Sequence, residues 1–300
     1  MILITGNSGF VGTNLFSYLK LNNYALDGLS LRDSGWQNKS TDANVIVNLV
    51  GKAHDHKGEA SESDFFRVNC ELSEKLFDYF LKSEASLFIH ISSIAALEEE
   101  SHDSIVDEDY RPNPKSAYGR SKRKAEEFLL SKQLPAGKKL VILRPTMIHG
   151  PGDKGNLTLL YKIINKGIPY PLGAFNNKRS FLGIDNLCFV IQKLIENKEN
   201  IATGTYNVSD DECLSTLDII RTIGVVSEKK PSILKIPKAV IKFLAKTGDV
   251  LKLPFNSKRL IKMTSNLVVS NAALKNVIGV EKFPLTAQQG LEKTIKSFNS

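Results

Sequence analysis

MILITGNSGFVG, residues 1–12, runs from an apolar segment straight into three glycines spaced three residues apart, and a helical pattern of apolar residues follows. Gly6 would allow a tight turn, Gly9 would let the backbone approach a pyrophosphate, and Gly12 would let the helix pack closely on the sheet. The N–H groups and the dipole of the helix start favour an anion. The stretch therefore predicts a strand, a turn and a helix that together bind the pyrophosphate of a dinucleotide.

Apolar runs and helical patterns alternate along the first half of the chain. The runs lie at 1–5, 45–50, 87–91 and 140–144, and the helical patterns lie at 10–20, 64–82 and 116–132. This alternation predicts an α/β fold, a Rossmann-type doubly wound parallel sheet with helices on both faces. Glycine and proline recur after Pro145, so we place a boundary near residue 150. Residues 1–150 would bind the dinucleotide, and 151–300 would form a smaller mixed α/β substrate domain, with segments near 180–205 returning to the first domain.

The composition is that of an ordinary globular protein, with 300 residues, 42% of them hydrophobic, and no apolar run long enough to span a membrane. There is no room for a signal peptide before Ile2, and the cysteines (Cys70, Cys188 and Cys213) form no C-x-x-C pair, so we expect a cytoplasmic protein. The net charge is +8, and residues 235–262 supply an excess of seven positive charges. Because the remainder is nearly neutral, we expect no binding of nucleic acid.

A tyrosine and a lysine, Tyr118 and Lys122, lie four residues apart within the helical pattern 116–132. At this spacing the two side chains share one face of a helix, where the ammonium would lower the pKa of the phenol. Such a tyrosine can exchange a proton with an alcohol near neutral pH. Ser93 follows the run 87–91 and is expected at the carboxyl end of a buried strand, where open α/β sheets bind ligands. We therefore predict a catalytic set of Ser93, Tyr118 and Lys122.

These motifs resemble the extended short-chain dehydrogenase/reductases, the family of NAD-dependent epimerases and dehydratases. The resemblance covers nearly the whole chain. Its further motifs are Val45-Ile-Val-Asn-Leu-Val50, Val68-Asn69, Ile91-Ser-Ser93, Leu143-Arg-Pro145 with Gly150-Pro-Gly152, and Arg179-Ser-Phe-x-x-Ile-Asp185-Asn. Most members act on nucleotide-activated sugars. The resemblance therefore implies an enzyme that uses NADP or NAD and takes a nucleotide sugar as its substrate.

The resemblance also implies roles for single residues. Ser93 would hydrogen-bond the hydroxyl or ketone at the reacting carbon, with Ser92 as the competing choice. Lys122 would bond the nicotinamide ribose, and Asn69 would hold a strand and a helix together. The implied cofactor contacts are Gly6, Ser8, Gly9, Phe10, Val11, Arg32, Leu49, Tyr118 and Lys122.

The end of the second strand, expected at 24–31, bears on the choice of cofactor. An acid about twenty residues past the glycine turn selects NAD, whereas an arginine accommodates NADP. Ser30 stands where many epimerases have Asp, and Arg32 and Asp33 follow it. Arg32 favours NADP and Asp33 favours NAD, and we expect NADP by a small margin.

Substrate contacts are implied for the second half of the chain. Asn156 and Arg179 resemble the residues that hold the sugar-nucleotide diphosphate, a task suited to the donors of arginine. Leu172-Gly173 lies where the family cradles the base, usually uracil. His149 would either touch the sugar or pack in the interior.

Two stretches argue against other chemistries. Family dehydratases place Asp-Glu directly after the catalytic Ser or Thr, whereas Ile94 and Ala95 stand here and cannot move a proton. The acids at 98–100 come later and are expected in an exposed loop over 97–114. His54-Asp55-His56 lacks an evident third ligand, so we expect no metal.

The expected reaction is hydride transfer at C4 of a nucleotide-linked hexose, of the UDP-hexose or UDP-N-acetylhexosamine type, in surface-polysaccharide biosynthesis. We favour a 4-keto-sugar reductase, because Ser30-Leu-Arg32 lacks the acid of epimerases. One alternative is a UDP-sugar 4-epimerase, including one that acts on a polyprenyl-diphosphate-linked sugar. A second alternative is a non-catalytic dinucleotide-binding sensor, against which the intact Ser93, Tyr118 and Lys122 argue.

Two surface features each leave two interpretations open. The helical pattern 64–82 carries a wide apolar stripe, which fits either core packing or a homodimer interface, since family members commonly dimerise through this helix and the Tyr118 helix. Residues 235–262 fit either a solvated helix or a helix in peripheral contact with a membrane surface. In this segment the apolar residues Ile236, Val240, Ile241, Phe243 and Leu244 lie beside Lys238, Lys242 and Lys246.

Overall fold

The computed structural model describes residues 1–53, 61–100, 104–153, 155–253 and 255–298. At its centre is a six-stranded parallel sheet in the order β2-β1-β3-β4-β5-β8. The strands are β1 (Ile2–Thr5), β2 (Leu26–Leu29), β3 (Val45–Asn48), β4 (Leu87–Ile91), β5 (Lys139–Pro145) and β8 (Gly204–Val208). Every residue of β1, β3 and β4 is buried, as parallel strands covered on both faces require. The predicted Rossmann-type sheet is confirmed.

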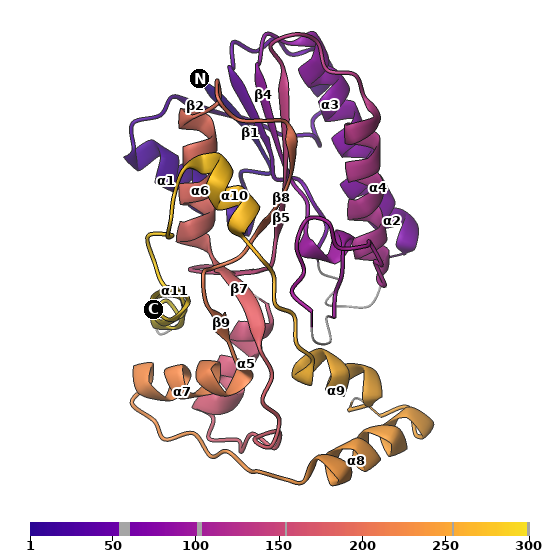
Figure 1. The fold of residues 1–300 in the computed structure, drawn as a ribbon, viewed down its shortest axis with the longest axis vertical. Coiled ribbons are helices and arrows are strands. Elements are labelled where there is room, and N and C mark those ends of the chain that lie inside the picture. The colour runs from indigo at the N-terminus through magenta and orange to yellow at the C-terminus, as the bar shows by residue number, and fades with distance from the viewer. Residues whose placement is uncertain (54–60, 101–103, 154, 254, 299–300) are drawn as a thin grey trace.

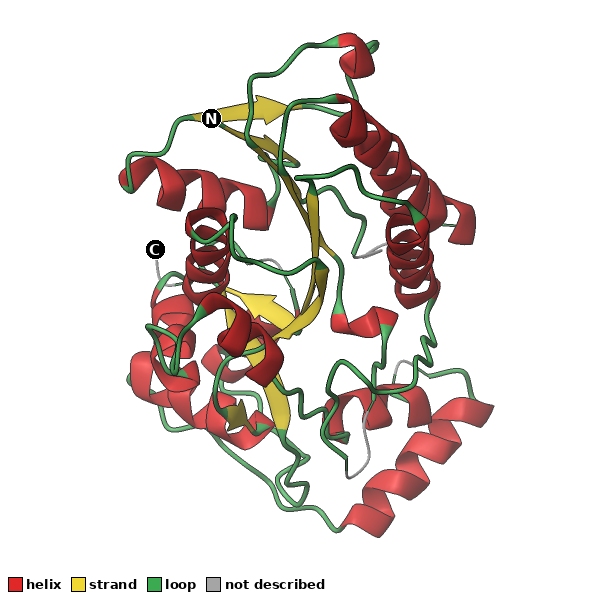
Figure 2. Ribbon diagram, turned by 45° about the horizontal axis from the view of Figure 1, so that its top comes forward, coloured by secondary structure: helices red, strands yellow, loops and turns green. Residues whose placement is uncertain are grey.

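Helices cover both faces of this sheet (Figures 1 and 2). Ile2 and Ile4 of β1 pack in one cluster with α1 (Phe10–Leu21) and α6 (Ile184–Glu196). Leu3, which points to the other face, packs in a second cluster with α3 (Leu72–Lys82) and α4 (Ala117–Ser131). The alternation of side chains along each strand thus separates two cores on either side of the sheet.

The second region is built on a small three-stranded sheet in the order β6-β7-β9. Its strands are β6 (Met147–His149), β7 (Arg179–Gly183) and β9 (Cys213–Leu214). Its helices are α5 (Asn156–Asn165), α7 (Thr216–Val226), α8 (Lys238–Val250), α9 (Ser257–Thr264) and α11 (Ala287–Lys296). Side chains of all five helices share one apolar cluster with β7 and β9. A mixed α/β region therefore follows the boundary placed near residue 150.

The chain crosses between the two regions more than once. Helix α6 packs against α1, and β8 extends the main sheet beside β5, so the segment near 180–205 returns to the first region. Helix α10 (Ala272–Ile278) returns as well, because Leu274 and Ile278 belong to the core under α1 and α6. This return of α10 to the first region was not predicted from the sequence.

Three expected elements differ in the structure. The helical pattern 64–82 is divided into α2 (Glu62–Phe66), a π-helical turn η2 (Arg67–Glu71) and α3. Strand β2 is shorter than the expected 24–31, because only its central residues pair with β1. The stretch 97–114 is not simply exposed: Leu97 and Val106 are fully buried, and Val106 bridges Val269. The sequence pattern missed this because the residues that bury the stretch lie more than 150 positions away.

The apolar stripe of 64–82 is largely core. Phe77 and Phe80 are fully buried and contact Phe88 of β4, with ring centroids 5.1 and 5.2 Å away. A homodimer through this helix stays a prediction. None of the helices in the described ranges combines the length and apolar composition needed to cross a bilayer.

Candidate active site

The glycine turn between β1 and α1 has the shape of an anion cradle. Gly6 has a φ of 72°, in the left-handed region that favours glycine. A Cβ on Gly6 would lie 3.0 Å from the carbonyl carbon of Leu49, and a Cβ on Gly12 would lie 2.2 Å from the carbonyl oxygen of Gly6. Side chains at these two positions would therefore collide with the backbone of the turn and of the end of β3. The glycines present fit a turn that lets a pyrophosphate approach the backbone, and their role in binding a dinucleotide stays a prediction.

The turn lies where the sheet topology reverses. Strands β2 and β3 flank β1 on opposite sides. In open α/β sheets, ligands bind in the crevice outside the carboxyl ends of the strands at such a point. Gly6 follows β1 and Leu49 follows β3, so both lie at this edge, and Ser8, Phe10 and Val11 belong to the same turn and the first turn of α1. Their roles as cofactor contacts stay predictions.

The structure brings the predicted catalytic residues together. The side chain of Ser116 caps α4 by accepting the N–H of Gly119 at 3.0 Å, which places Tyr118 in the first turn and Lys122 in the second. Ser93 follows β4, and its hydroxyl lies beside the phenol of Tyr118. The ammonium of Lys122 donates to the carbonyl oxygen of Ile91 at 2.8 Å, two residues before Ser93. The end of β4 and the start of α4 therefore form one site.

Ser92, the competing serine, lies elsewhere. Its hydroxyl donates to Glu126, which is fully buried and accepts two hydrogen bonds from Nε and one from Nη2 of Arg144. Because Ser92 is part of this buried ion-pair network, the geometry favours Ser93 as the serine beside Tyr118.

The expected effect of Lys122 on the tyrosine is wrong in this structure. Burial raises the pKa of Tyr118 above its ordinary value of 10.0, although the neighbouring Ser93 hydroxyl opposes this, and the charge of Glu99 raises the pKa further. Lys122 is only 4% exposed, and burial lowers its own pKa to about 8. Its ammonium is turned to the Ile91 carbonyl, so a helical spacing of four residues did not by itself bring this charge onto the phenol.

Two acids that the sequence analysis placed in solvent lie in the site region. Glu99 accepts hydrogen bonds from the N–H of Ser116 at 2.9 Å and from the Ser116 hydroxyl, so it fixes the start of α4. Burial lowers the pKa of the Arg179 guanidinium, and Glu100 lies near enough for its charge to oppose this shift. Glu98 is only 4% exposed. The prediction of a solvated acidic run is therefore wrong, and no local sequence pattern reveals these long-range partners.

Asn69 has the structural role expected of it. It accepts the N–H of Lys52 at 2.7 Å, and its amide donates to the Lys52 carbonyl and to the hydroxyl of Ser121 on α4. Ser121 in turn donates to the carbonyl oxygen of Tyr118. The π-helical turn that carries Asn69 thus ties the loop after β3 to the helix of the catalytic tyrosine, a use common for such turns at functional sites.

The residues bearing on the choice of cofactor lie on the surface after β2. Ser30 directly follows β2, and its hydroxyl accepts the N–H of Arg32 at 3.3 Å. The side chain of Arg32 is exposed, whereas Asp33 forms an ion pair with Lys39 at 3.3 Å. Asp33 therefore already has a partner, whereas the charge of Arg32 is more available to a ligand.

The expected diphosphate contacts lie in the second region. Asn156 is the exposed first residue of α5, at a helix start that favours anions. Arg179, half-buried at the start of β7, donates to the hydroxyl and carbonyl oxygens of Ser265 at 2.9 and 3.2 Å. Ser265, which directly follows α9, was not found from the sequence. Leu172 is buried, and Gly173 donates its N–H to Leu234.

His149 packs in the interior, which corrects its assignment as a substrate contact. The side chain is 1% exposed, and its Nδ1 lies 2.9 Å from the hydroxyl of Thr294. Burial lowers its pKa to about 4. Its Nε2 faces Asp210 at 4.0 Å, and burial raises the pKa of that carboxyl to about 6. The structure therefore supports the interpretation of His149 as a packed residue, because α11 covers the end of β6.

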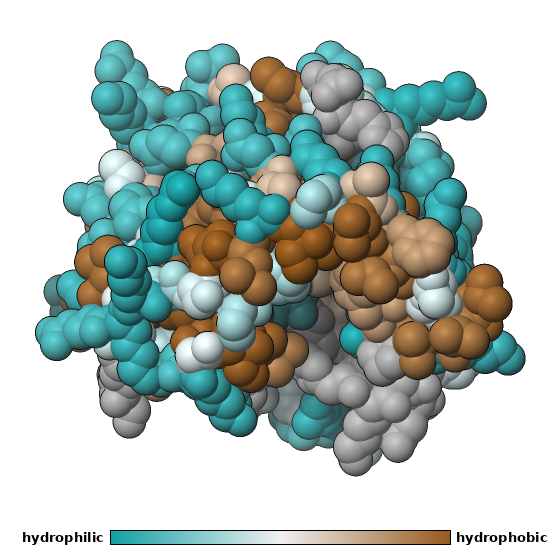
Figure 3. Space-filling view, turned by 90° about the horizontal axis from the view of Figure 1, so that it is seen from below, coloured by the Kyte–Doolittle hydropathy of each residue, from teal (hydrophilic) through white to brown (hydrophobic). Residues whose placement is uncertain are grey.

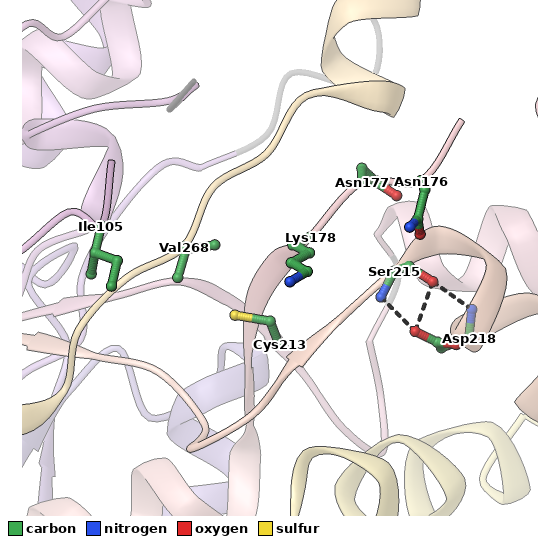
Figure 4. A pocket seen from close by; sticks show the side chains of 8 residues that line it. All are labelled: Ile105, Asn176, Asn177, Lys178, Cys213, Ser215, Asp218 and Val268. Carbon is green, nitrogen blue, oxygen red and sulfur yellow. Dashed lines mark hydrogen bonds between the residues drawn. The ribbon is translucent and has the colours of Figure 1, made fainter. Parts of the chain in front are cut away.

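A cavity of about 490 Å³ lies between Ile105 and residues of the second region, one of which is Lys178 beside Arg179 (Figure 4). Its polar wall includes Ser215 and Asp218, which are already hydrogen-bonded to each other in the capping box of α7. The lining residues are Ile105, Asn176, Asn177, Lys178, Cys213, Ser215, Asp218 and Val268. None of the predicted catalytic residues lines it.

Metal ligands were not expected. Within the described ranges, no group of three or more His, Cys, Asp or Glu side chains could hold a metal ion. His54-Asp55-His56 lies outside the described residues, so its expected lack of metal stays a prediction.

Comparison with known proteins bears on this geometry. The UDP-glucose 4-epimerase of Vibrio cholerae is 32% identical over 325 aligned residues, covering 99% of this chain and 95% of that protein. The N-acetyl-alpha-D-glucosaminyl-diphospho-ditrans,octacis-undecaprenol 4-epimerase of Escherichia coli O157:H7 is 25% identical, covering 98% of this chain and 94% of that protein.

Solved structures share the fold. The UDP-glucuronic acid 4-epimerase from Bacillus cereus in complex with NAD superposes with a TM-score of 0.75 at 20% identity, covering 99% of this chain and 98% of that one. RMD from Pseudomonas aeruginosa complexed with NADPH superposes with a TM-score of 0.77 at 18% identity, covering all of both chains. At these identities the likeness shows the fold alone.

The model of the NAD dependent epimerase/dehydratase family matches residues 2–209, which include the glycine turn and Ser93, Tyr118 and Lys122. The expectation of an NAD(P)-dependent enzyme is thereby confirmed at the level of the family. The chain belongs to the NAD dependent epimerase/dehydratase family.

Proposed function

We propose that this protein is a 4-epimerase of a UDP-hexose or UDP-N-acetylhexosamine, which keeps its dinucleotide bound through the cycle. The approach of the Ser93 hydroxyl to the Tyr118 phenol, with Lys122 beside them and the glycine turn nearby, carries the proposal of C4–OH chemistry. The 32% identity to the V. cholerae UDP-glucose 4-epimerase supports epimerisation as its outcome.

In the proposed reaction, Tyr118 accepts the proton of the sugar 4-hydroxyl and later returns it. Ser93 hydrogen-bonds the same oxygen and holds it beside the phenol. The bound dinucleotide supplies the reversible hydride exchange at C4 and, when oxidised, a positive charge that favours the phenolate. Burial raises the pKa of Tyr118, so the tyrosine holds its proton until positive charge is present in the cleft. Orientation of the sugar and the poised acid/base supply most of the rate.

Substrate binding is assigned to the second region. Arg179 would hold the diphosphate with its fork of donors, and Asn156 would do so from the start of α5. Ser265 orients the guanidinium, and the nearby negative charge of Glu100 weakens the attraction of Arg179 for an anion. We therefore expect both residues to contribute to the affinity for the diphosphate.

The preference for a 4-keto-sugar reductase has less support than epimerisation. It depends on Ser30 and Arg32, and the exposed Arg32 remains compatible with NADP. A reductase consumes one reduced cofactor in each turnover and must release it oxidised, whereas an epimerase returns its cofactor unchanged. We propose NAD as the cofactor, because the matched family is NAD dependent.

The test begins with the purified protein, denatured so that any nucleotide is released and identified by mass spectrometry. The protein is then incubated with UDP-glucose or UDP-N-acetylglucosamine without added cofactor, and the product is identified by NMR. We expect retained NAD and the C4 epimer, and loss of both turnover and product with Tyr118→Phe. Stoichiometric use of NADPH on a UDP-4-keto sugar, without epimerisation, would establish the reductase instead.

One observation favours a second candidate substrate, a sugar joined to a polyprenyl diphosphate. Arg179 is anchored by Ser265, the residue after α9, so the expected diphosphate site adjoins the helix pair α8 and α9. The E. coli relative that is named as an undecaprenol-linked 4-epimerase matches 98% of this chain. Turnover of a UDP-sugar but not of a prenyl-diphosphate sugar in detergent, or the reverse, would separate the two candidates.

A further inference from the structure

Helices α8 and α9 and their connection present an apolar surface that the site does not use. We call it the α8–α9 face. Figure 3 views the end of the molecule where Figure 1 places α8, and it shows apolar side chains gathered in a band there. The residues that define the face, with their exposed fractions, are Val240 (46%), Phe243 (69%), Leu244 (48%), Val250 (80%), Leu251 (62%), Leu253 (47%) and Ile261 (46%).

Helix α8 carries two apolar stripes, of which one is buried and the other is exposed. Ile241, Ala245 and Gly248 recur at helical spacing and are buried toward α9 and the core of the second region. At about 100° per residue, the exposed apolar residues of α8 fall in a separate arc that faces outward. The exposed stripe can therefore be buried only against a partner outside this chain.

Basic side chains border this apolar arc. Eight basic residues between 235 and 262 are exposed, and within the described part of the chain none of them forms an ion pair. Lys242 and Lys246 lie on the side of α8 next to Phe243, and Lys252 lies between Leu251 and Leu253. The acid in this segment, Asp249, accepts the N–H of Ser257. Exposed apolar and cationic groups therefore coincide on one face.

We propose that the α8–α9 face docks on a lipid bilayer that contains anionic lipid. A helix with an exposed apolar face and lysines beside it lies in the interface of such a bilayer, where the apolar side chains enter the headgroup boundary and the ammonium groups meet the lipid phosphates. A protein partner fits less well, because the centres of protein interfaces are depleted of lysine. This inference does not depend on the proposed function.

Docking in this orientation would also locate the expected diphosphate site. Ser265 holds Arg179 and directly follows α9, whose Ile261 belongs to the α8–α9 face. The guanidinium would then lie close to the plane of the lipid headgroups. A diphosphate attached to a membrane lipid would reach Arg179 without leaving the bilayer.

Co-sedimentation of the full chain with vesicles tests the proposal. The vesicles are of phosphatidylcholine alone, or with about 30% phosphatidylglycerol to supply negative surface charge. We expect binding to the anionic vesicles, with the partition coefficient falling about tenfold or more in Lys242→Glu/Lys246→Glu. Phe243→Glu/Leu251→Glu should abolish binding. Leu21→Glu, at a residue that is 83% exposed on α1, is the matched control and should bind like the wild type.

Three results would overturn the proposal: no co-sedimentation at low salt, equal losses in Leu21→Glu and the face variants, or equal binding to vesicles with and without phosphatidylglycerol. A concentration-dependent dimer that Phe243→Glu/Leu251→Glu dissociates, without vesicle binding, would assign the face to a second copy of the chain. The face variants are also assayed with a UDP-sugar. Turnover at the wild-type rate shows that they are folded, and failure of that assay in the wild type concerns the proposed function alone.

Discussion

The two regions of the molecule hold their functional side chains in different ways. Around the cofactor cradle, Ser93, Tyr118 and Lys122 meet where the end of β4 lies against the start of α4, and Lys122 is held by a hydrogen bond to the Ile91 carbonyl. In the substrate region, Asn156 is exposed and Arg179 depends on a single residue, Ser265. The predicted catalytic residues therefore lie at the edge of the central sheet, whereas the predicted substrate contacts lie on elements with fewer constraints. A family can change substrates in such a region while it keeps its reaction.

Removing the phenol should have the largest effect. We expect Tyr118→Phe to lower kcat by about 10²–10⁴-fold, because the proposed acid/base is lost. The measurement is the rate of C4 epimerisation, with retained dinucleotide measured on the same sample. Activity within a factor of ten of the wild type, with the cofactor still bound, would remove Tyr118 from the mechanism.

Lys122→Met should change stability and activity in opposite directions. Burial lowers the pKa of Lys122 to about 8 in the folded protein from 10.5, so the unfolded chain binds more protons between these values and this lysine makes stability rise with pH across that window. Below about pH 8 the buried charge of Lys122 lowers the free energy of unfolding by up to about 3 kcal/mol. The hydrogen bond to Ile91 offsets part of this cost.

The measurement for Lys122→Met is urea unfolding of cofactor-stripped protein between pH 7 and 10. We expect the variant to be more stable at pH 7, with the difference shrinking as the pH rises, and to be impaired in epimerisation. A difference that is independent of pH would mean that the burial of this charge carries no cost.

Changes at the diphosphate site should affect KM more than kcat. We expect Arg179→Ala to raise KM for the UDP-sugar about 10- to 100-fold, because a charge-assisted pair with phosphate is lost, and Ser265→Ala to act in the same direction but more weakly. Steady-state kinetics of both variants measure this. An equal fall in kcat and kcat/KM would place Arg179 in the transition state instead.

His149→Asn should change stability by the smallest amount and leave catalysis alone. We expect a loss of about 1 kcal/mol, since the hydrogen bond with Thr294 is weakened in a buried position. Urea unfolding measures the loss, and KM for the UDP-sugar should equal that of the wild type. A raised KM without a change in stability would return His149 to the substrate site.

Much of the cofactor half was predictable because its signals are local. The glycine spacing, the apolar runs and the four-residue interval from Tyr118 to Lys122 each depend on neighbours within a few turns or one strand. Which of Ser92 and Ser93 faces the site was less predictable, since adjacent residues at a strand end point to opposite sides. Only the buried pair of Glu126 and Arg144 shows which serine is withdrawn from the site.

The sequence alone determined the parallel sheet and the family, and it predicted the dinucleotide cradle and the catalytic set, because periodicity and motif spacing depend on residues that are close together along the chain. The tertiary structure decided that Glu99 fixes the Tyr118 helix, that Ser265 holds Arg179, that His149 is packed under α11, and that α8 turns an apolar stripe outward. The physical reason is distance along the chain. Burial and the pKa of a side chain depend on groups that folding brings together from tens or hundreds of residues away.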